Sequence, residues 1–152
     1  MDILAFIDLG IMMENRISVL YELAAEKASL AHPEYSAELK KLSNEEIGHA
    51  NSLRMGRNFA AEMPDLFSFR SRASDDMGKL IEENGRIIEK LAAEKDLKSL
   101  LLNLLDLEKR FEKLHLTAST VTKDDSLNSL FSSLSIGDQN HIRTVSEILN
   151  KL

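Results

Sequence analysis

The sequence predicts an all-α protein, a four-helix bundle in which one long crossover, containing a short extra helix, joins the second and third long helices. The chain has 152 residues, enough for one compact domain with its own core, so residues 1–152 are expected to form a single domain. Only two prolines and six glycines interrupt it, which is too few for a turn-rich β architecture. Unequal connection lengths then decide the topology.

The first two long helices are delimited by the two prolines. A helix is expected over about 3–31, because Pro33 disfavours helical conformation at the residue before it. A second helix is expected over about 34–63, ending before Pro64. Since the turn between them is short, these helices are predicted to form an antiparallel hairpin.

The segment 63–76 is predicted to be irregular and to end in an N-cap cluster, Ser74-Asp75-Asp76. A shorter amphipathic helix follows, with Leu80, Ile81, Ile87, Ile88 and Leu91 on one side. This apolar side suits either a cover over the bundle or a contact between two copies of the chain, and we expect a homodimer.

Two further long helices are expected over about 95–120 and 126–150, joined by the polar turn 122–125 with its acidic cap. A helix of about 28 residues is roughly 42 Å long at 1.5 Å per residue. The 31 residues between the second and third long helices can span that length even if most are helical. This favours one long crossover over an up-down-up-down bundle.

Composition and charge exclude several classes of function. Without cysteine, the chain has no disulfide, thiolate zinc site, iron–sulfur cluster or cysteine nucleophile, so any metal must bind nitrogen and oxygen. A net charge of −6 argues against binding to nucleic acid or anionic membrane. No targeting signal is recognised, and no apolar run approaches the roughly 18 residues of a membrane helix. We expect a soluble, cytoplasmic protein whose partners are cations or small molecules.

Each long helix interrupts its apolar stripe with a carboxylate near the middle. Seven residues fall only about 20° short of two full turns, so a heptad column stays on one face of a helix. Two of the four carboxylates are followed three residues later by a histidine. Counted from the two short turns, these side chains lie at similar heights and can converge on one cavity: Glu14, Glu46, His49, Glu108, Asp138 and His141.

Four carboxylates facing one core require compensation, since a buried, unpaired carboxylate costs several kcal/mol. Cations are the obvious compensation, and carboxylate with imidazole suits iron or manganese, with zinc as a substitute. A satisfied polar network without metal is the alternative. Glu112 falls off the core columns, so the pair Glu112 and His115 is interpreted as a surface acid with a supporting or capping imidazole; a further pair of metal ligands is the alternative. Glu45 points about 100° away from Glu46 and is expected to be solvated; the methionines and phenylalanines are expected to fill the core.

These residues resemble the di-iron pattern of the ferritin-like superfamily, and are closest to the erythrin domain of rubrerythrins. The resemblance rests on Glu14 with Tyr21, Glu46-x-x-His49, Glu108, and Asp138-x-x-His141, and it covers nearly the whole chain. An internal repeat supports it, because Glu14 and Glu46 are 32 residues apart while Glu108 and Asp138 are 30 apart. The resemblance implies two iron ions bridged by Glu46 and Asp138, with Glu14 and Glu108 as terminal ligands and one histidine on each iron. It also implies Tyr21 as a hydrogen-bond donor beside the metals.

Three positions depart from the family pattern. Asp138 replaces the usual Glu and is one methylene shorter, and His115 stands where the family usually has Tyr. Phe111 stands where peroxide-reducing rubrerythrins carry a second Glu, which weakens the assignment of a peroxidase. Without cysteine there is no rubredoxin-like domain, so electrons must come from a separate donor protein.

The function that the resemblance implies is a di-iron oxidoreductase that acts on peroxide or O₂ with an external electron donor. Two alternatives stay open at the level of the sequence. One is a ferroxidase-type protein that binds and handles iron. The other is a structural or regulatory helical protein with an inert site.

Overall fold

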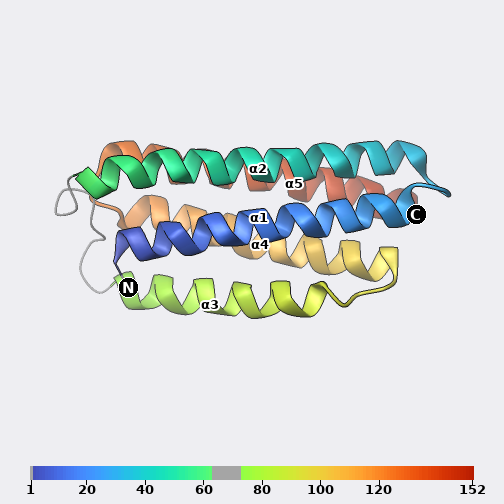
Figure 1. Cartoon of the computed structure of the whole chain (residues 1–152), viewed down its shortest axis with the longest axis horizontal. Coiled ribbons are helices and arrows are strands. Elements are labelled where there is room, and N and C mark those ends of the chain that lie inside the picture. The colour runs from blue at the N-terminus through green and yellow to red at the C-terminus, as the bar shows by residue number, and fades with distance from the viewer. Residues whose placement is uncertain (1, 63–72) are drawn as a thin grey trace.

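The computed structural model describes residues 2–62 and 73–152, and these residues form five α-helices (Figure 1). The prediction of an all-α protein is therefore confirmed. The helices are α1 (Ile3–Ala28), α2 (Pro33–Glu62), α3 (Ala73–Leu91), α4 (Leu97–Val121) and α5 (Asp125–Lys151). Within this part of the chain, no helix is long and apolar enough to cross a membrane.

Aspartate side chains cap three of the helices. Asp2, Asp96 and Asp124 each accept a hydrogen bond from a backbone N–H in the first turn of the following helix, at 2.8, 2.9 and 3.0 Å. The helix α1 ends three residues before the predicted boundary, and α2 begins at Pro33 itself. Proline is tolerated there because the first turn of a helix leaves its N–H groups unbonded.

The helix α3 begins earlier than the sequence predicts. It starts at Ala73, so Asp75 and Asp76 lie in its first turn rather than before it, where their charges favour the positive end of the helix dipole. The predicted irregular segment falls outside the described residues over 63–72. Four apolar side chains of α3 are buried in the common core: Met77, Ile81, Ile88 and Leu91.

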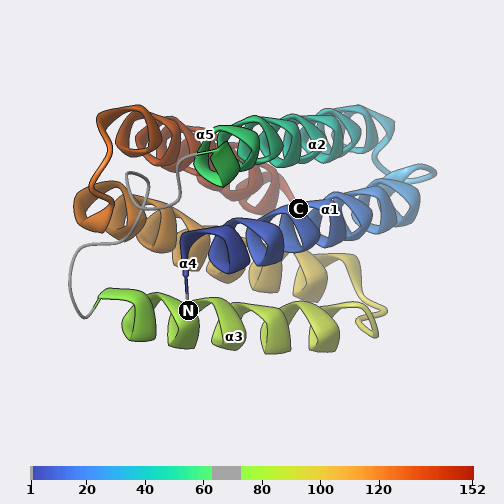
Figure 2. The same ribbon diagram turned by 60° about the vertical axis from the view of Figure 1, so that its left-hand side comes forward.

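The position of α3 decides between the two interpretations of its apolar side. This helix lies along α1 and α4, and its apolar side covers the bundle (Figures 1 and 2). The homodimer stays a prediction, and the apolar side of α3 no longer supports it because that side is buried against α1 and α4 of the same chain.

The four long helices form two antiparallel hairpins, α1 with α2 and α4 with α5, that pack against each other (Figure 2). In Figure 1, α3 runs back along the length of the bundle, so α2 and α4 point in the same direction. Within the first hairpin, the hydroxyl of Ser18 donates to the backbone oxygen of Ser43 at 2.9 Å. The hydroxyl of Ser43 donates to the backbone oxygen of Ser18 at 2.8 Å. These reciprocal bonds let α1 and α2 pack closely without leaving a buried hydroxyl unpaired.

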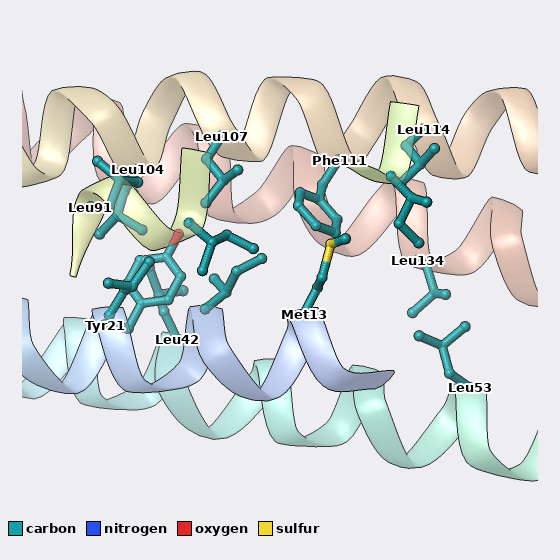
Figure 3. Close-up of a cluster of buried hydrophobic side chains, with 14 of the residues drawn as sticks. Met13, Tyr21, Leu42, Leu53, Leu91, Leu104, Leu107, Phe111, Leu114 and Leu134 are labelled. Atoms are coloured by element: carbon teal, nitrogen blue, oxygen red, sulfur yellow. The ribbon is translucent and has the colours of Figure 1, made fainter. Parts of the chain in front are cut away.

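The apolar core is assembled from all five helices (Figure 3). Tyr21 and Met13 of α1 face leucines and Phe111 of α4 in this view. The expectation that methionines and phenylalanines fill the core holds only in part. Met13 is 3% exposed, but Met55 is 64% and Phe59 is 60% exposed, both on α2.

Candidate metal centre

The four predicted carboxylate ligands lie in the interior of the bundle, one on each long helix. The side chains of Glu14, Glu46, Glu108 and Asp138 are each 1% exposed. In the described residues no Lys or Arg is buried with them; the nearby cationic or potentially cationic groups are histidines. Because ionised carboxylates in a low-dielectric interior repel one another, the arrangement requires protons or metal ions to balance its charge.

The imidazole of His141 lies at the centre of this cluster. Its Nδ1 is 2.9 Å from Glu46 Oε1 and 3.2 Å from Glu108 Oε1. Its Nε2 is 2.9 Å from Glu45 Oε2. Burial lowers the pKa of His141, but hydrogen bonds to Glu108 and Glu46 outweigh it and raise this pKa to about 12. Without metal, His141 is therefore an imidazolium that donates from both nitrogens.

The carboxylate of Glu46 lies between two imidazoles. One oxygen faces His141, and the other, Oε2, lies 3.1 Å from His49 Nδ1. Burial and repulsion from Glu108 raise the pKa of Glu46 to about 8. A carboxylate with one oxygen toward each histidine has the disposition of a ligand that bridges two ions.

Glu14 is the least satisfied of the four acids. Its Oε1 accepts no hydrogen bond, and the nearest imidazole nitrogen, His115 Nε2, is 3.5 Å away. Its Oε2 lies 3.9 Å from His49 Nδ1. Burial and repulsion from Glu46 raise the pKa of Glu14 well above its ordinary value. A buried carboxylate oxygen without a donor is a position that a cation would satisfy.

Asp138 is held within its own hairpin. Its Oδ2 lies 2.6 Å from Nδ1 of His115, which is 3% exposed. Burial and repulsion from Glu108 raise the pKa of Asp138, whereas burial lowers the pKa of His115. Asp138 also lies in the group of ligand atoms around His141, within 4.8 Å of one another, and its bridging role stays a prediction.

Tyr21 contacts the fourth carboxylate. Its hydroxyl donates to Glu108 Oε1 at 2.5 Å, and its ring meets the His141 ring edge-on with centroids 6.0 Å apart. Burial would raise the pKa of Glu108, but hydrogen bonds from His141, Glu46 and Tyr21 outweigh it and lower this pKa. Glu108 is thus the acid in the cluster that is most readily ionised.

The described side chains form two overlapping groups that could hold a metal ion. One contains Glu46, His49 and His141, and the other contains Glu108, Asp138 and His141; in each, the ligand atoms lie within 4.8 Å of one another. Five of the six predicted positions fall in these two groups, and the sixth, Glu14, lies beside them, 3.9 Å from His49 Nδ1. The donor set of carboxylate and imidazole fits iron, manganese or zinc, and it does not identify which of them binds.

Two residues near the centre were placed differently by the sequence. Glu45 was expected to be solvated, but its side chain is 41% exposed and bonds His141, because α5 lies on that flank of α2. His115 is the supporting imidazole that the sequence suggests, but the acids it faces are Glu14 and Asp138 rather than Glu112. Glu112 instead accepts hydrogen bonds from Ser135 and Gln139, at 3.2 and 3.1 Å.

The seam between α2 and α5 opens the centre to solvent. A groove of about 770 Å³ there is lined by His49 and His141. His49 is 16% exposed at its side chain, and a Cβ atom at Gly137 would lie 2.6 Å from its Nε2. Glycine at 137 therefore makes room for the imidazole of His49, which a small molecule can reach from this side, whereas the side chain of His141 is 1% exposed and is bonded to Glu45.

Comparison of the chain with protein-family models, with curated proteins and with solved structures finds no match.

Proposed function

We propose that this chain is a ferritin-like di-iron oxidoreductase of the rubrerythrin type, which reduces peroxide or O₂ with electrons from a separate donor protein. The observation that carries the proposal is the burial of four carboxylates and His141 beside the half-buried His49 in the interior of a helical bundle. Glu14 Oε1 is buried without a hydrogen-bond donor, and no Lys or Arg is buried among the described residues. Both observations support cations as the missing partners of the acids.

Each ligand has a role in this proposal. Glu46 bridges the two ions, since its oxygens face different histidines. Glu14 and His49 complete one side of the site, and Glu108 and His141 the other. Asp138 is the second bridging candidate by resemblance, and His115 orients it.

The chemistry divides between the metal and the chain. Two ferrous ions, when bound, supply the electrons and the Lewis acidity that cleavage of an O–O bond needs. The hydroxyl of Tyr21 donates a hydrogen bond to Glu108 Oε1 and keeps that carboxylate in position. Glu45 accepts a hydrogen bond from His141 Nε2, which leaves Nδ1 directed at Glu46 and Glu108. The surrounding leucines and Phe111 exclude bulk water.

The departures from the family define what this protein lacks. Phe111 cannot serve as the second Glu of peroxide-reducing rubrerythrins, so any change of ligands during turnover must use other residues. These 152 residues contain no cysteine and so carry no thiolate-bound redox centre of their own, which is why the proposal names a separate electron donor. We therefore expect reaction of the reduced site with oxidant to be rapid, and re-reduction to depend on an added donor.

The test is anaerobic loading with two Fe(II) per chain, followed by stopped-flow mixing with hydrogen peroxide or O₂. We expect iron oxidation faster than that of free Fe(II) under the same conditions. Glu46→Gln should abolish the acceleration, while Glu112→Gln, which removes an acid of α4 that bonds Ser135 and Gln139 and is not among the six proposed ligands, should retain it. Oxidation no faster than free Fe(II), or far less than two ions per chain, would contradict the proposal.

A second candidate function, iron binding and oxidation without repeated turnover, is favoured by one feature. Three glutamates, Glu38, Glu45 and Glu147, line the groove that leads to the histidines, against two basic residues, Lys41 and Arg143. Such a rim attracts cations. This function predicts reversible iron uptake and a single round of oxidation even with donor present. A sedimentation mass would show whether the chains form a closed cage.

A further inference from the structure

Two cavities lie in series along the seam between α2 and α5. The groove over His49 and His141 has a volume of about 770 Å³, and a second pocket of about 340 Å³ adjoins it. Ser52 lines both, so the two cavities are neighbours on the same seam. At 1.5 Å per residue along α2, Met55 lies about 9 Å and Phe59 about 15 Å from His49. The volumes fall within the range of small-molecule sites.

The second pocket is apolar. Among the residues that the structure describes, no charged side chain lines it; its walls are Met55, Gly56, Phe59, Leu127 and Leu130, with Ser52 and Ser126 at its edges. Gly56 forms the floor, since a Cβ atom there would lie 2.6 Å from Leu130 Cδ2 and 3.2 Å from Leu127 Cδ2. The leucines thus pack directly on the backbone of α2, and the exposed side chains of Met55 and Phe59 stand beside them.

The two ends of the seam differ in chemistry. Glutamate, lysine and arginine side chains rim the groove at the His49 end, whereas the described residues at the Phe59 end offer hydrocarbon, thioether and hydroxyl groups. Hydrogen peroxide and O₂ require no apolar pocket next to the site that reduces them. A molecule with a polar reacting group and a hydrocarbon group of short length matches both ends.

We propose that the substrate of this site is an alkyl or aryl hydroperoxide, with its peroxide group at the His49 end and its hydrocarbon group in the apolar pocket. This rests on the proposed function. The O–O bond breaks, two electrons come from two ferrous ions that become ferric, and two protons come from water. The products are an alcohol and a water molecule.

The first test compares two oxidants on the ferrous-loaded chain, cumene hydroperoxide and hydrogen peroxide. In the double variant Met55→Gln with Phe59→Gln, we expect the rate constant for cumene hydroperoxide to fall about tenfold, as for loss of apolar contacts in a substrate pocket. The rate constant for hydrogen peroxide should not change. Leu102→Gln is the matched control, since Leu102 is 51% exposed on α4, away from the seam.

The second test measures binding without redox chemistry. The zinc-loaded chain, labelled with ¹³C at the methionine methyl groups, is titrated with cumyl alcohol, the reduced product. We expect a saturable NMR shift of the Met55 methyl and none at Met12, which is 41% exposed on α1. Absence of a Met55 shift would overturn the inference, because the pocket then holds no hydrocarbon group.

The two tests separate this inference from the function on which it rests. Suppose that iron oxidation is accelerated, but the ratio of the rate constants for cumene hydroperoxide and hydrogen peroxide is the same in the double variant as in the unmodified chain. This result overturns the inference and leaves the proposed function standing. No acceleration by any oxidant, together with a saturable Met55 shift, overturns the function and supports the pocket as a hydrocarbon site. If the ratio of the two rate constants is unchanged and the double variant loses a dimer that the unmodified chain forms in sedimentation, the pocket is a contact between two copies. This result also overturns the inference.

Discussion

The two hairpins carry corresponding ligands, yet they hold them differently. Glu14 in the first hairpin and Glu108 in the second are the acids that have no histidine three residues later. In each hairpin, the residue seven positions after this Glu lies next to the corresponding Glu of the other hairpin. Tyr21 of the first donates to Glu108 of the second at 2.5 Å, and His115 Nε2 of the second lies 3.5 Å from Glu14 of the first. The crossing is therefore reciprocal, although one side uses a phenol and the other an imidazole.

The difference lies in what the acids of the x-x-His motifs contact. Glu46 reaches across to His141 while it also faces its own His49, whereas the shorter Asp138 is bound by His115 from the same hairpin. The outer nitrogens of the two motif histidines differ too. Nε2 of His141 has the carboxylate of Glu45, and Nε2 of His49 faces Gly137. The first hairpin thus supplies Glu46, which links the two hairpins, and the second supplies His141, the imidazole with hydrogen-bond partners at both nitrogens.

If the proposed site binds metal, its removal should have the largest effect, because ions held by residues of both hairpins would join them. Binding at a thousandfold excess over Kd stabilises by about 4 kcal/mol per ion. For a chain of this size that corresponds to about 8–16 °C in melting temperature per ion. Thermal scans at neutral pH with iron(II) and with chelator measure the gap. Equal melting temperatures would contradict a metal site between the hairpins.

The pH dependence of the metal-free protein should be next in size. A carboxyl whose folded pKa is raised stabilises the fold below its unfolded pKa and loses that contribution as pH rises through the folded value. For Glu46 the ordinary pKa is 4.5 and the folded pKa about 8. The chelated protein should therefore lose stability between about pH 4.5 and 8, by up to about 1.4 kcal/mol per pH unit for this group.

Urea titrations at several pH values, with chelator, measure this slope. Glu46→Gln should flatten it over that window, and Glu112→Gln should leave it as it is. Metal-loaded protein should show the opposite trend, because metal displaces protons from its ligands. A chelated protein whose stability rises from pH 5 to 8 would argue that the acids are not buried together.

The unequal support of the two histidines can be tested with Glu45→Gln. Loss of a carboxylate that orients a ligating histidine typically weakens metal affinity about 10- to 100-fold. Calorimetric titration with Mn(II) should show this loss for one ion of the two, at the His141 side. Glu38→Gln, which removes another acid from the groove, is the control. An equal loss in both variants would mean that groove charge, and not the orientation of His141, sets the affinity.

The smallest effect is expected from Tyr21→Phe. The variant removes a hydrogen bond to an ionised carboxylate, and such bonds contribute about 1.5 kcal/mol or more. Urea denaturation of the chelated protein at pH 7 should register the loss. Tyr35→Phe is the matched control, since Tyr35 stacks on His32 far along the chain from the acids. No difference between the two variants would show that the Tyr21 contact does not link the hairpins.

Residue spacing was sufficient to predict the main ligand set but not all of its surroundings. Heptad columns and distances from the turns bring Glu46 and His141 to one height whatever the details of packing. The contact of Glu45 depends on which flank of α2 receives α5, and the pairing of His115 depends on the reach of Asp138. The apolar side of α3 fits a bundle or a partner equally well by sequence, and only the packing decides.

The reciprocal contacts have a consequence for how such a chain can arise. A hairpin that reaches the single Glu of its neighbour, and offers its own in return, is self-complementary. Two identical copies would satisfy the same contacts about a twofold axis. Fusion into one chain releases the halves from that symmetry, so each can change alone. The pairs Tyr21 with His115 and Glu46 with Asp138 have the pattern expected of duplicated halves that diverged in this way.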